Sequence, residues 1–469
     1  MITLPERSGL PLYQQLYQAL RQEIQTGGIS AGQKLPSKRK LAEQLNVSVN
    51  TVDSAYTQLE AEGFVQSSPR RGFFVLETGW LPQAAAPVVP APEAPPEPSA
   101  YRVDFSPWGM ARDQFPFGVW RRLMKQCFNE YDPTLLLRTA PQGDIGLRRA
   151  VADYLYRARG VSCTPEQVII GAGTDNLLLM LSYIFPEETA LAVENPLYNQ
   201  THRLFARMGH RLYTVPVTPE GIDIGQLPKA DSVIVYTTPS HQYPLGYAMP
   251  ISKRTALLRW SSQGRGRYII EDDYDSEFRY VSRPIPSLQS IDSLGRVIYL
   301  GTFSRSVAPA LRISYMVLPG ELLSLYHERY HGYASTVSGF EQAVLREFMT
   351  SGRFETHVNR MRSYYRARRK TLVDALGPLS SAMEILGAPA GHHLPLCFHG
   401  DMDEGRLIRT AKAAGVRVYP VSPYFIGDLP ERYRSTVLLG FGGLTDDEIR
   451  LGASLLLDAW QKKGEPYES

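Results

Sequence analysis

A proline-rich stretch, residues 81–98, is the feature that most limits how this chain can fold. Seven of its residues are proline, which fixes φ and has no N–H to donate, so neither a helix nor a sheet ladder can run through it. We expect a semi-extended spacer of the polyproline type, with a binding site for a proline-recognising module as the alternative. The chain is therefore predicted to consist of a small domain at residues 1–76, a linker at residues 77–102 and a large domain at residues 103–469.

Bulk composition excludes several classes of protein. A net charge of +3 over 469 residues is too small to indicate a partner by itself. The three cysteines (Cys127, Cys163 and Cys397) have neither the spacing of metal ligands nor that of a disulfide framework. The first residues contain no apolar run like that of a signal peptide, and no uncharged stretch reaches membrane-spanning length. We therefore expect a cytoplasmic protein without a metal site or a membrane segment.

The small domain shows three helical patterns followed by two strand patterns. Two glycines follow the first helix, and Pro36 with Ser37 marks the start of the second, since serine can cap a helix. Three helices and a two-stranded wing with a basic tip predict a winged helix-turn-helix domain. The helices are expected at residues 12–24, 38–45 and 50–63, and the strands at residues 64–65 and 71–75.

Three motif strings, PSKRKLA, NVSVNTVDSAYTQLEAEGF and RRGFFV, resemble the GntR class of DNA-binding domains. In that geometry the third helix lies in the major groove of double-stranded DNA, and a dimer reads paired half-sites. The alternative is that these charges only solvate a small domain, since residues up to Val75 include eight basic and six acidic side chains. The expected DNA contacts are Ser37, Lys38 and Arg39 in the second helix and its cap, Ser48, Asn50 and Thr51 in the third, and Arg70, Arg71 and Gly72 in the wing.

Val49 departs from the GntR pattern, which usually has an arginine after the serine of the turn. A valine side chain can contact a thymine methyl group but cannot donate a hydrogen bond to guanine. The operator sequence therefore stays undecided.

In the large domain, strand patterns alternate with amphipathic helices, which predicts an α/β fold with a mainly parallel sheet covered by helices on both faces. Ligands of such sheets bind at the carboxyl ends of the strands. Three of these ends carry groups suited to a phosphate or a flat ring, although each also has a purely structural explanation. They are the glycine turn and helix start at Gly173, Thr174 and Asp175, the aromatic ring of Tyr198, and the loop with His241, Gln242 and Tyr243.

A fourth strand end is acidic, in the string EDDYDSEFRY. A carboxylate at the end of a buried strand is costly unless it is paired, and the protonated nitrogen of a pyridine ring would pair with it. Asp272 is the candidate for that role, and Tyr274 would donate a hydrogen bond to a ring oxygen. An acidic loop in solvent or a metal site is the alternative, and no histidine cluster accompanies the acids to support a metal.

The string GTFSRSVAPALRISY at residues 301–315 follows a further strand and combines small hydroxyls with two arginines. Thr302, Ser304, Arg305 and Arg312 could supply donors and positive charge to a phosphate. The stretch resembles the Schiff-base segment of fold-type I aminotransferases, in which a lysine takes the place of Arg305. With TPSHQYPLG and EDDYDSEFRY it resembles the MocR/GabR family still more closely, which fuses a GntR-type winged helix to an aminotransferase-like domain.

The resemblance implies a fold-type I aminotransferase-like domain that senses pyridoxal phosphate and often an amino acid, in a head-to-tail homodimer. It implies that Tyr198 stacks on the ring, that Asp272 and Tyr274 hold its nitrogen and phenolic oxygen, and that Thr174, Ser304 and Arg312 bind phosphate or a carboxylate. The full set of expected cofactor contacts is Gly173, Thr174, Asp175, Tyr198, His241, Asp272, Tyr274, Thr302, Ser304, Arg305 and Arg312.

Arg305 removes the expected catalytic residue, because a guanidinium stays charged and does not form an imine with an aldehyde. Lys229 and Lys253, the only lysines between Lys125 and Lys370, are predicted to lie away from the carboxyl ends of the strands. The cavity could then hold pyridoxal phosphate non-covalently and more weakly, prefer a preformed imine or the amine form, or hold another ligand or none.

These features predict a transcription regulator that is not an enzyme and responds to a small molecule. One alternative is a pyridoxal-phosphate-dependent aminotransferase with an accessory DNA-binding domain, which the missing lysine opposes. Another is a DNA-binding protein whose large domain serves only for dimerisation. Neither the sensed amino acid nor the choice between activation and repression follows from the residues.

Overall fold

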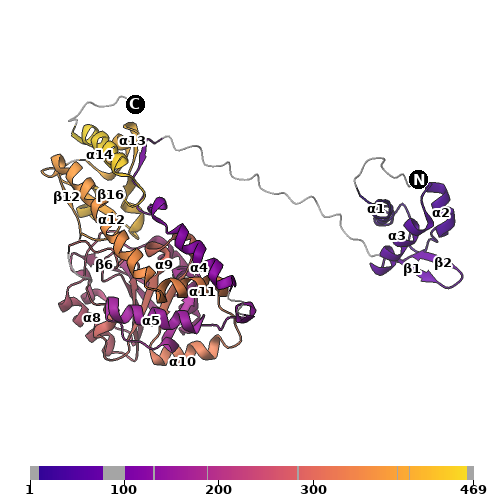
Figure 1. Cartoon of the computed structure of the whole chain (residues 1–469), viewed down its shortest axis with the longest axis horizontal. Helices are drawn as coiled ribbons and strands as arrows, with labels where there is room; N and C mark the ends of the chain where they lie inside the picture. Colours follow the sequence, from indigo (N-terminus) through magenta and orange to yellow (C-terminus); the bar gives the residue numbers. More distant parts are fainter. Residues whose placement is uncertain are drawn as a thin grey trace. The chain divides into compact units, whose positions relative to one another are not determined.

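The computed structural model describes residues 10–77, 101–129, 133–186, 189–281, 285–387, 389–400 and 402–461. The spacer expected at residues 81–98 lies outside these ranges, as do residues 1–9, where no signal peptide is expected. The chain forms two compact units, Met1–Pro96 and Glu97–Ser469. Figure 1 draws both units.

The first unit is a winged helix, as predicted. Its elements are α1 (Leu12–Gln25), α2 (Lys38–Leu45), α3 (Val49–Ala61), β1 (Val65–Ser68) and β2 (Gly72–Val75). Serine hydroxyls begin two of the helices: Ser37 accepts a hydrogen bond from the backbone N–H of Lys40, and Ser48 accepts one from Thr51. β1 and β2 pair antiparallel, and Leu16, Val52 and Tyr56 are fully buried in the core beneath them.

The second unit is built on an eight-stranded sheet in the order β4-β11-β10-β9-β8-β5-β6-β7. Its five central strands, from β10 to β6, run parallel, whereas β11 and β7 pair antiparallel with their neighbours. The mainly parallel sheet is therefore confirmed. The strands are β4 (Val168–Gly171), β5 (Ala190–Asn195), β6 (Leu212–Thr218), β7 (Gly221–Ile222), β8 (Ser232–Thr237), β9 (Gly266–Asp273), β10 (Val297–Thr302) and β11 (Ser314–Val317).

Helices cover both faces of this sheet, which successive residues of one strand demonstrate. Ile170 packs in the same core as residues of α5 (Ile145–Arg159) and α11 (Gly339–Thr350), whereas Ile169 packs with residues of α6 (Thr174–Ile184) and α10 (Gly320–Arg329). The helices of the unit are α4 (Phe117–Asn129), α5 (Ile145–Arg159), α6 (Thr174–Ile184), α7 (Asn199–Arg207), α8 (Ile251–Ser262), α9 (Phe303–Ser306), α10 (Gly320–Arg329), α11 (Gly339–Thr350), α12 (Arg353–Ala375), α13 (Glu404–Ala413) and α14 (Asp446–Gln461).

A smaller antiparallel sheet, in the order β12-β13-β16-β15, was not predicted from the sequence. It shares a buried core with α12, α13 and α14, and in Figure 1 it lies with α13 and α14 at the end of the unit away from α5 and α10. Its strands are β12 (Met383–Ile385), β13 (His393–Phe398), β15 (Tyr419–Pro420) and β16 (Thr436–Gly440), and nearby β3 (Val103–Asp104) pairs with β14 (Val416–Arg417). None of the helices within the described ranges combines the length and the apolarity needed to cross a membrane.

Candidate functional site

A cavity of about 280 Å³ lies at the carboxyl ends of four neighbouring strands, β5, β8, β9 and β10. The sheet order brings their last residues into one wall, although they are far apart in the sequence. The lining residues are Trp108, Thr174, Asp175, Glu194, Leu197, Tyr198, Thr201, Tyr236, Thr238, Tyr243, Asp272, Tyr274, Thr302, Ser304, Arg305, Pro309 and Arg312. All but Gly173 and His241 of the cofactor contacts expected from the sequence are in this wall, and their contact with a ligand stays a prediction.

One end of the cavity is cationic and lies at the start of α6. Gly173 caps this helix with φ of 92°, and the guanidinium of Arg312 fills the space where a side chain at position 173 would be. Arg312 lies 3.6 Å from the Asp175 carboxylate, and more than half of each side chain is exposed. Such a weak, hydrated pair leaves Arg312 able to turn to an anion at the helix N-terminus.

Tyr198 lies at the start of α7 and presents its ring to the cavity. Burial raises the pKa of its phenol and Asp175 adds to the rise, whereas Arg305 and Arg312 oppose it. Both arginines are therefore close enough to act on the same hydroxyl. The ring lies 5.9 Å from that of Tyr243, edge to face, which fixes the orientation of an aromatic wall.

Asp272, at the end of β9, is the buried acid of the cavity. The Tyr236 hydroxyl donates a hydrogen bond to it. Burial raises the pKa of Asp272 to about 7, and that hydrogen bond opposes the rise, while Asp273, Asp275 and Glu194 increase it. Within the described ranges no cationic side chain pairs with Asp272, so a positively charged ligand group beside it would relieve the cost of ionisation.

The other acids near Asp272 already have partners, and all of them are buried. Asp273 accepts hydrogen bonds from Arg159 at 2.7 Å and from the Tyr299 hydroxyl at 2.5 Å, and Asp275 lies 2.9 Å from Nδ1 of His241. Glu271 accepts the backbone N–H groups of residues 288 and 289. The alternative of an acidic loop in solvent is therefore excluded, and Asp272 is the acid of this strand end that faces the cavity.

His241 is not among the residues that line the cavity, and its expected contact with a ligand stays a prediction. This histidine is buried outside the cavity, with Nδ1 lying 3.0 Å from the Tyr274 hydroxyl oxygen. Gln242 is likewise absent from the wall, because its amide donates to the carbonyls of Pro196 and Tyr243. His241 therefore contacts Tyr274, which lines the cavity.

Several wall residues were missed by the sequence analysis. Tyr236 reaches Asp272 across adjacent strands, and Glu194 is buried and accepts hydrogen bonds from the hydroxyls of Thr237 and Thr238. Burial raises the pKa of Glu194, and these hydrogen bonds limit the rise. Glu194 could have been predicted, because it is a polar residue near the end of a buried strand. Trp108 comes from a distant segment, and no sequence pattern indicates that it lies in the wall. The remaining missed residues are Leu197, Thr201, Thr238 and Pro309.

Arg305 belongs to α9, the short helix after β10, and its side chain lines the cavity. Its guanidinium donates one long hydrogen bond, 3.4 Å to the carbonyl of Pro107. In the part of the chain that the structure describes, no carboxylate lies within 4.0 Å of it and no lysine lines the cavity. Lys229 precedes β8 at the opposite end of the strand, and Lys253 lies in α8, 3.4 Å from Glu220.

The winged helix presents its expected DNA-contacting residues on loops and first turns. Arg39, Asn50, Arg70 and Arg71 are exposed, and Gly72 begins β2 with φ of 104°. The hydroxyls of Ser37 and Ser48 already cap α2 and α3, and Thr51 lies 2.8 Å from Ser48 through its own hydroxyl. Lys38 forms an ion pair with Asp53, so a phosphate would have to compete for it.

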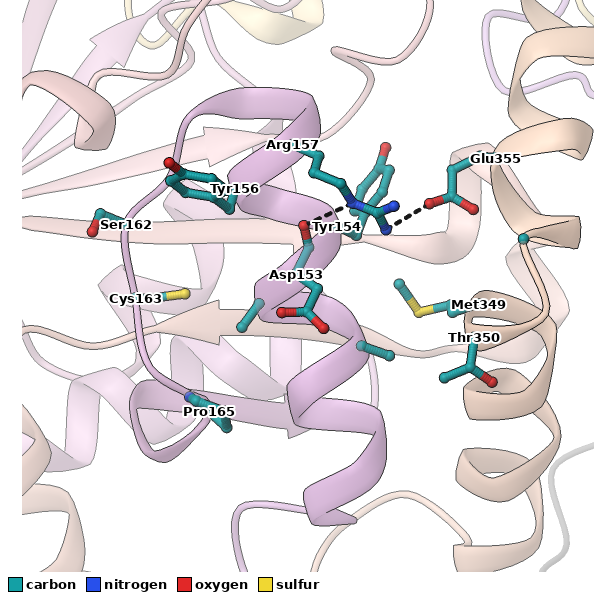
Figure 2. A pocket seen from close by; sticks show the side chains of 13 residues that line it. Asp153, Tyr154, Tyr156, Arg157, Ser162, Cys163, Pro165, Met349, Thr350 and Glu355 are labelled. Carbon is teal, nitrogen blue, oxygen red and sulfur yellow. Dashed lines mark hydrogen bonds and ion pairs between the residues drawn. The ribbon is translucent and has the colours of Figure 1, made fainter.

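A second cavity, of about 770 Å³, lies between α5 and the junction of α11 with α12. Figure 2 shows Arg157 turned to Glu355, which it contacts at 2.8 Å. Burial raises the pKa of the Cys163 thiol at its wall to about 11, so this cysteine is a poor nucleophile near neutral pH. The larger cavity offers no buried charge without a partner among its described residues, and the chemistry points to the smaller one.

Comparisons with known proteins match both units. Residues 12–75 match the family described as bacterial regulatory proteins, gntR family, and residues 110–422 match aminotransferase class I and II. YdeL, an uncharacterized HTH-type transcriptional regulator of Bacillus subtilis, is 40% identical over 96% of this chain and 97% of its own. The probable rhizopine catabolism regulatory protein MocR of Rhizobium meliloti is 32% identical over 98% and 96%.

A third relative is the HTH-type pyridoxine biosynthesis transcriptional regulator PdxR of Corynebacterium glutamicum, 29% identical over 95% of both chains. Among solved structures, the kynurenine aminotransferase of Pyrococcus horikoshii superposes with a TM-score of 0.68 at 23% identity, covering 77% of this chain and 91% of its own. That likeness shows the aminotransferase fold of the second unit.

Proposed function

We propose that this chain, which belongs to the MocR family of DNA-binding transcription regulators with an aminotransferase-like domain, responds to pyridoxal phosphate, to an amino acid or to both, without catalysing transamination. The observation that carries the proposal is Arg305 in the wall of the cavity that also holds Asp272, Tyr198 and Arg312. A cavity with these side chains has the chemistry to bind the cofactor, and Arg305 withholds the amine that would bond to it.

The residues of the cavity fit pyridoxal phosphate group by group. Asp272, buried and without a cationic partner among the described residues, would hold a protonated ring nitrogen. Tyr198 would stack on the ring. Arg312 and the first turn of α6 would hold the phosphate, together with the hydroxyls of Thr174 and Ser304. When bound, the cofactor supplies an aldehyde that reacts with amines.

Arg305 decides between sensing and catalysis. A guanidinium is not a nucleophile near neutral pH, so the cofactor would be held non-covalently and more weakly than by an imine. Transamination also needs a group that moves a proton at the substrate carbon, and an always-charged guanidinium cannot accept one. The relatives named as transcriptional regulators support a regulatory role, and an aminotransferase with an accessory domain is the weaker candidate.

The output of the regulator would be a change in DNA binding. α3 would enter the major groove, with Asn50 near the bases and Arg39 and the wing arginines on phosphates. A single small domain contacts few phosphates, so we propose a homodimer, arranged head to tail, that reads paired half-sites.

The covalent state of the cofactor tests the proposal directly. The purified chain is titrated with pyridoxal phosphate, followed by absorption, then reduced with borohydride and weighed by mass spectrometry. We expect the absorption of a bound free aldehyde and no added mass on the wild-type chain. Arg305→Lys, the matched control, should gain the mass of one phosphopyridoxyl group. An adduct on any lysine of the wild-type chain would contradict the proposal.

A second measurement separates the alternatives. Binding to DNA upstream of the chain's own gene is followed by fluorescence anisotropy, with and without pyridoxal phosphate and candidate amino acids. Ligand-dependent affinity supports the sensor. DNA binding with no cofactor uptake at any concentration supports a large domain that serves only for dimerisation, and steady turnover of an amino acid with a keto acid supports the enzyme.

A further inference from the structure

We propose that Arg305 makes the cavity selective for phosphopyridoxyl compounds whose 4-substituent carries a carboxylate, that is, for the cofactor already joined to an amino acid. This inference rests on the proposed binding of a phosphopyridoxyl group. It gives Arg305 a ligand to bind, in addition to the loss of the lysine that this residue replaces.

The hydrogen-bonding capacity of Arg305 is almost unused. A guanidinium has five N–H donors, and the structure gives one of them a single long contact, 3.4 Å to the Pro107 carbonyl. The side chain is half-buried, so water satisfies it only in part. No carboxylate lies within ion-pair distance in the described ranges, although Asp272 lines the same cavity.

The groups around Arg305 leave its charge uncompensated. Burial, more than any neighbour, raises the pKa values of Tyr243 and Tyr274 well above the ordinary value, so both phenols are neutral. These two wall residues therefore offer Arg305 no negative charge.

The ligand's own geometry connects this charge with the 4-substituent. In a phosphopyridoxyl group the ring nitrogen and the 4-substituent are at opposite ends of the ring. With the nitrogen at Asp272 and the phosphate at Arg312, the substituent points away from Asp272 and toward the rest of the wall, where Arg305 is the cation not used by the phosphate. A carboxylate there could accept two parallel N–H bonds from the guanidinium, the arrangement for which arginine is best suited.

The expected preference is large enough to measure. Hydrogen bonds between charged groups contribute enough to change affinity by about tenfold to a hundredfold. A matched ligand pair isolates the carboxylate: N-(5′-phosphopyridoxyl)-L-alanine and N-(5′-phosphopyridoxyl)ethylamine differ only in that group. We expect the full-length chain to bind the alanine compound at least about tenfold more tightly by isothermal titration calorimetry near neutral pH.

Two variants test whether Arg305 is the residue that causes the preference for the carboxylate. Arg305→Met should bind both compounds with nearly equal affinity, and its retained binding of the ethylamine compound shows that the cavity is still folded. Arg312→Met should weaken both compounds, because it removes a phosphate contact, and keep their ratio. Loss of the ratio in Arg312→Met but not in Arg305→Met would overturn the assignment. Equal affinities on the wild-type chain would refute the inference alone, whereas failure of both compounds to bind would refute the proposed function.

Discussion

Replacing Asp272 by asparagine should make the ligand-free large domain more stable, increasingly so as the pH rises. The carboxyl is buried and lacks a cationic partner in the described ranges, so its ionised form is costly in the folded state. Asparagine keeps an oxygen that can accept the Tyr236 hydrogen bond and removes the charge. The variant therefore keeps the hydrogen bond and avoids the free-energy cost of a buried charge.

The magnitude follows from the pKa of Asp272, which burial raises from 3.8 to about 7. A raised pKa means that the folded state binds more protons than the unfolded state between these values, so stability falls as the pH rises from about 4 to 7 and then levels off. At about 1.4 kcal/mol per pKa unit, ionisation of Asp272 lowers the free energy of unfolding by roughly 1.5 kcal/mol at pH 5 and by roughly 4 kcal/mol at pH 8. The free energy of unfolding of Asp272→Asn, relative to that of wild type, should therefore be about 2 to 3 kcal/mol larger at pH 8 than at pH 5.

Differential scanning calorimetry of the full-length chain measures this gain. For a domain of this size the unfolding entropy is about 0.8 kcal/mol/K, so the melting temperature of Asp272→Asn relative to wild type should rise by about 3 °C more at pH 8 than at pH 5. Asp153→Asn, which changes an exposed acid of α5, is the control and should show no such difference. A variant that is no more stable than wild type at pH 8 would refute the burial cost assigned to Asp272.

Two further predictions concern the winged helix. Ser48→Ala removes the hydroxyl that accepts the Thr51 N–H, so the small-domain transition should lose about 1 kcal/mol in calorimetry, and an unchanged transition would show that the cap is dispensable. Arg39→Gln removes an exposed cation of α2, so the slope of log affinity for DNA against log salt should decrease by about 1, while Arg434→Gln in the second unit should leave it unchanged. Equal slopes for both variants would exclude a phosphate contact at Arg39.

Local chemistry was enough to predict the winged helix and the nature of the large sheet. Ser37 caps α2 as predicted, because capping depends only on a hydroxyl and the next three residues, and Ser48 caps α3 by the same chemistry. The carboxyl-end location of the cavity also followed, since it is a property of parallel sheets rather than of particular residues. The roles of the wall residues toward a ligand stay predictions.

What could not be predicted depends on neighbours that are remote in the sequence. Tyr236 meets Asp272 only because β8 and β9 pair in the register that sets Tyr236 opposite Ile270. The sequence places His241 in a polar loop, and its burial depends on contacts with Asp275 and Tyr274, which lie more than thirty residues away. The small antiparallel sheet consists of strands of two to six residues, which are too short for a clear alternating pattern.

The separate core of the winged helix has a consequence for truncated forms of the chain. Its fully buried residues are covered by side chains from within residues 10–77; they include Leu16, Val52, Tyr56 and Leu59. Proteolysis after residue 77 would therefore leave a folded winged-helix domain. Such a fragment would carry neither the cavity nor the large domain, and because a single small domain contacts few phosphates it would bind an operator only weakly. In a cell that produced both forms, the fragment would compete with the intact regulator only when present in large excess, and its binding to DNA would not change with the ligand.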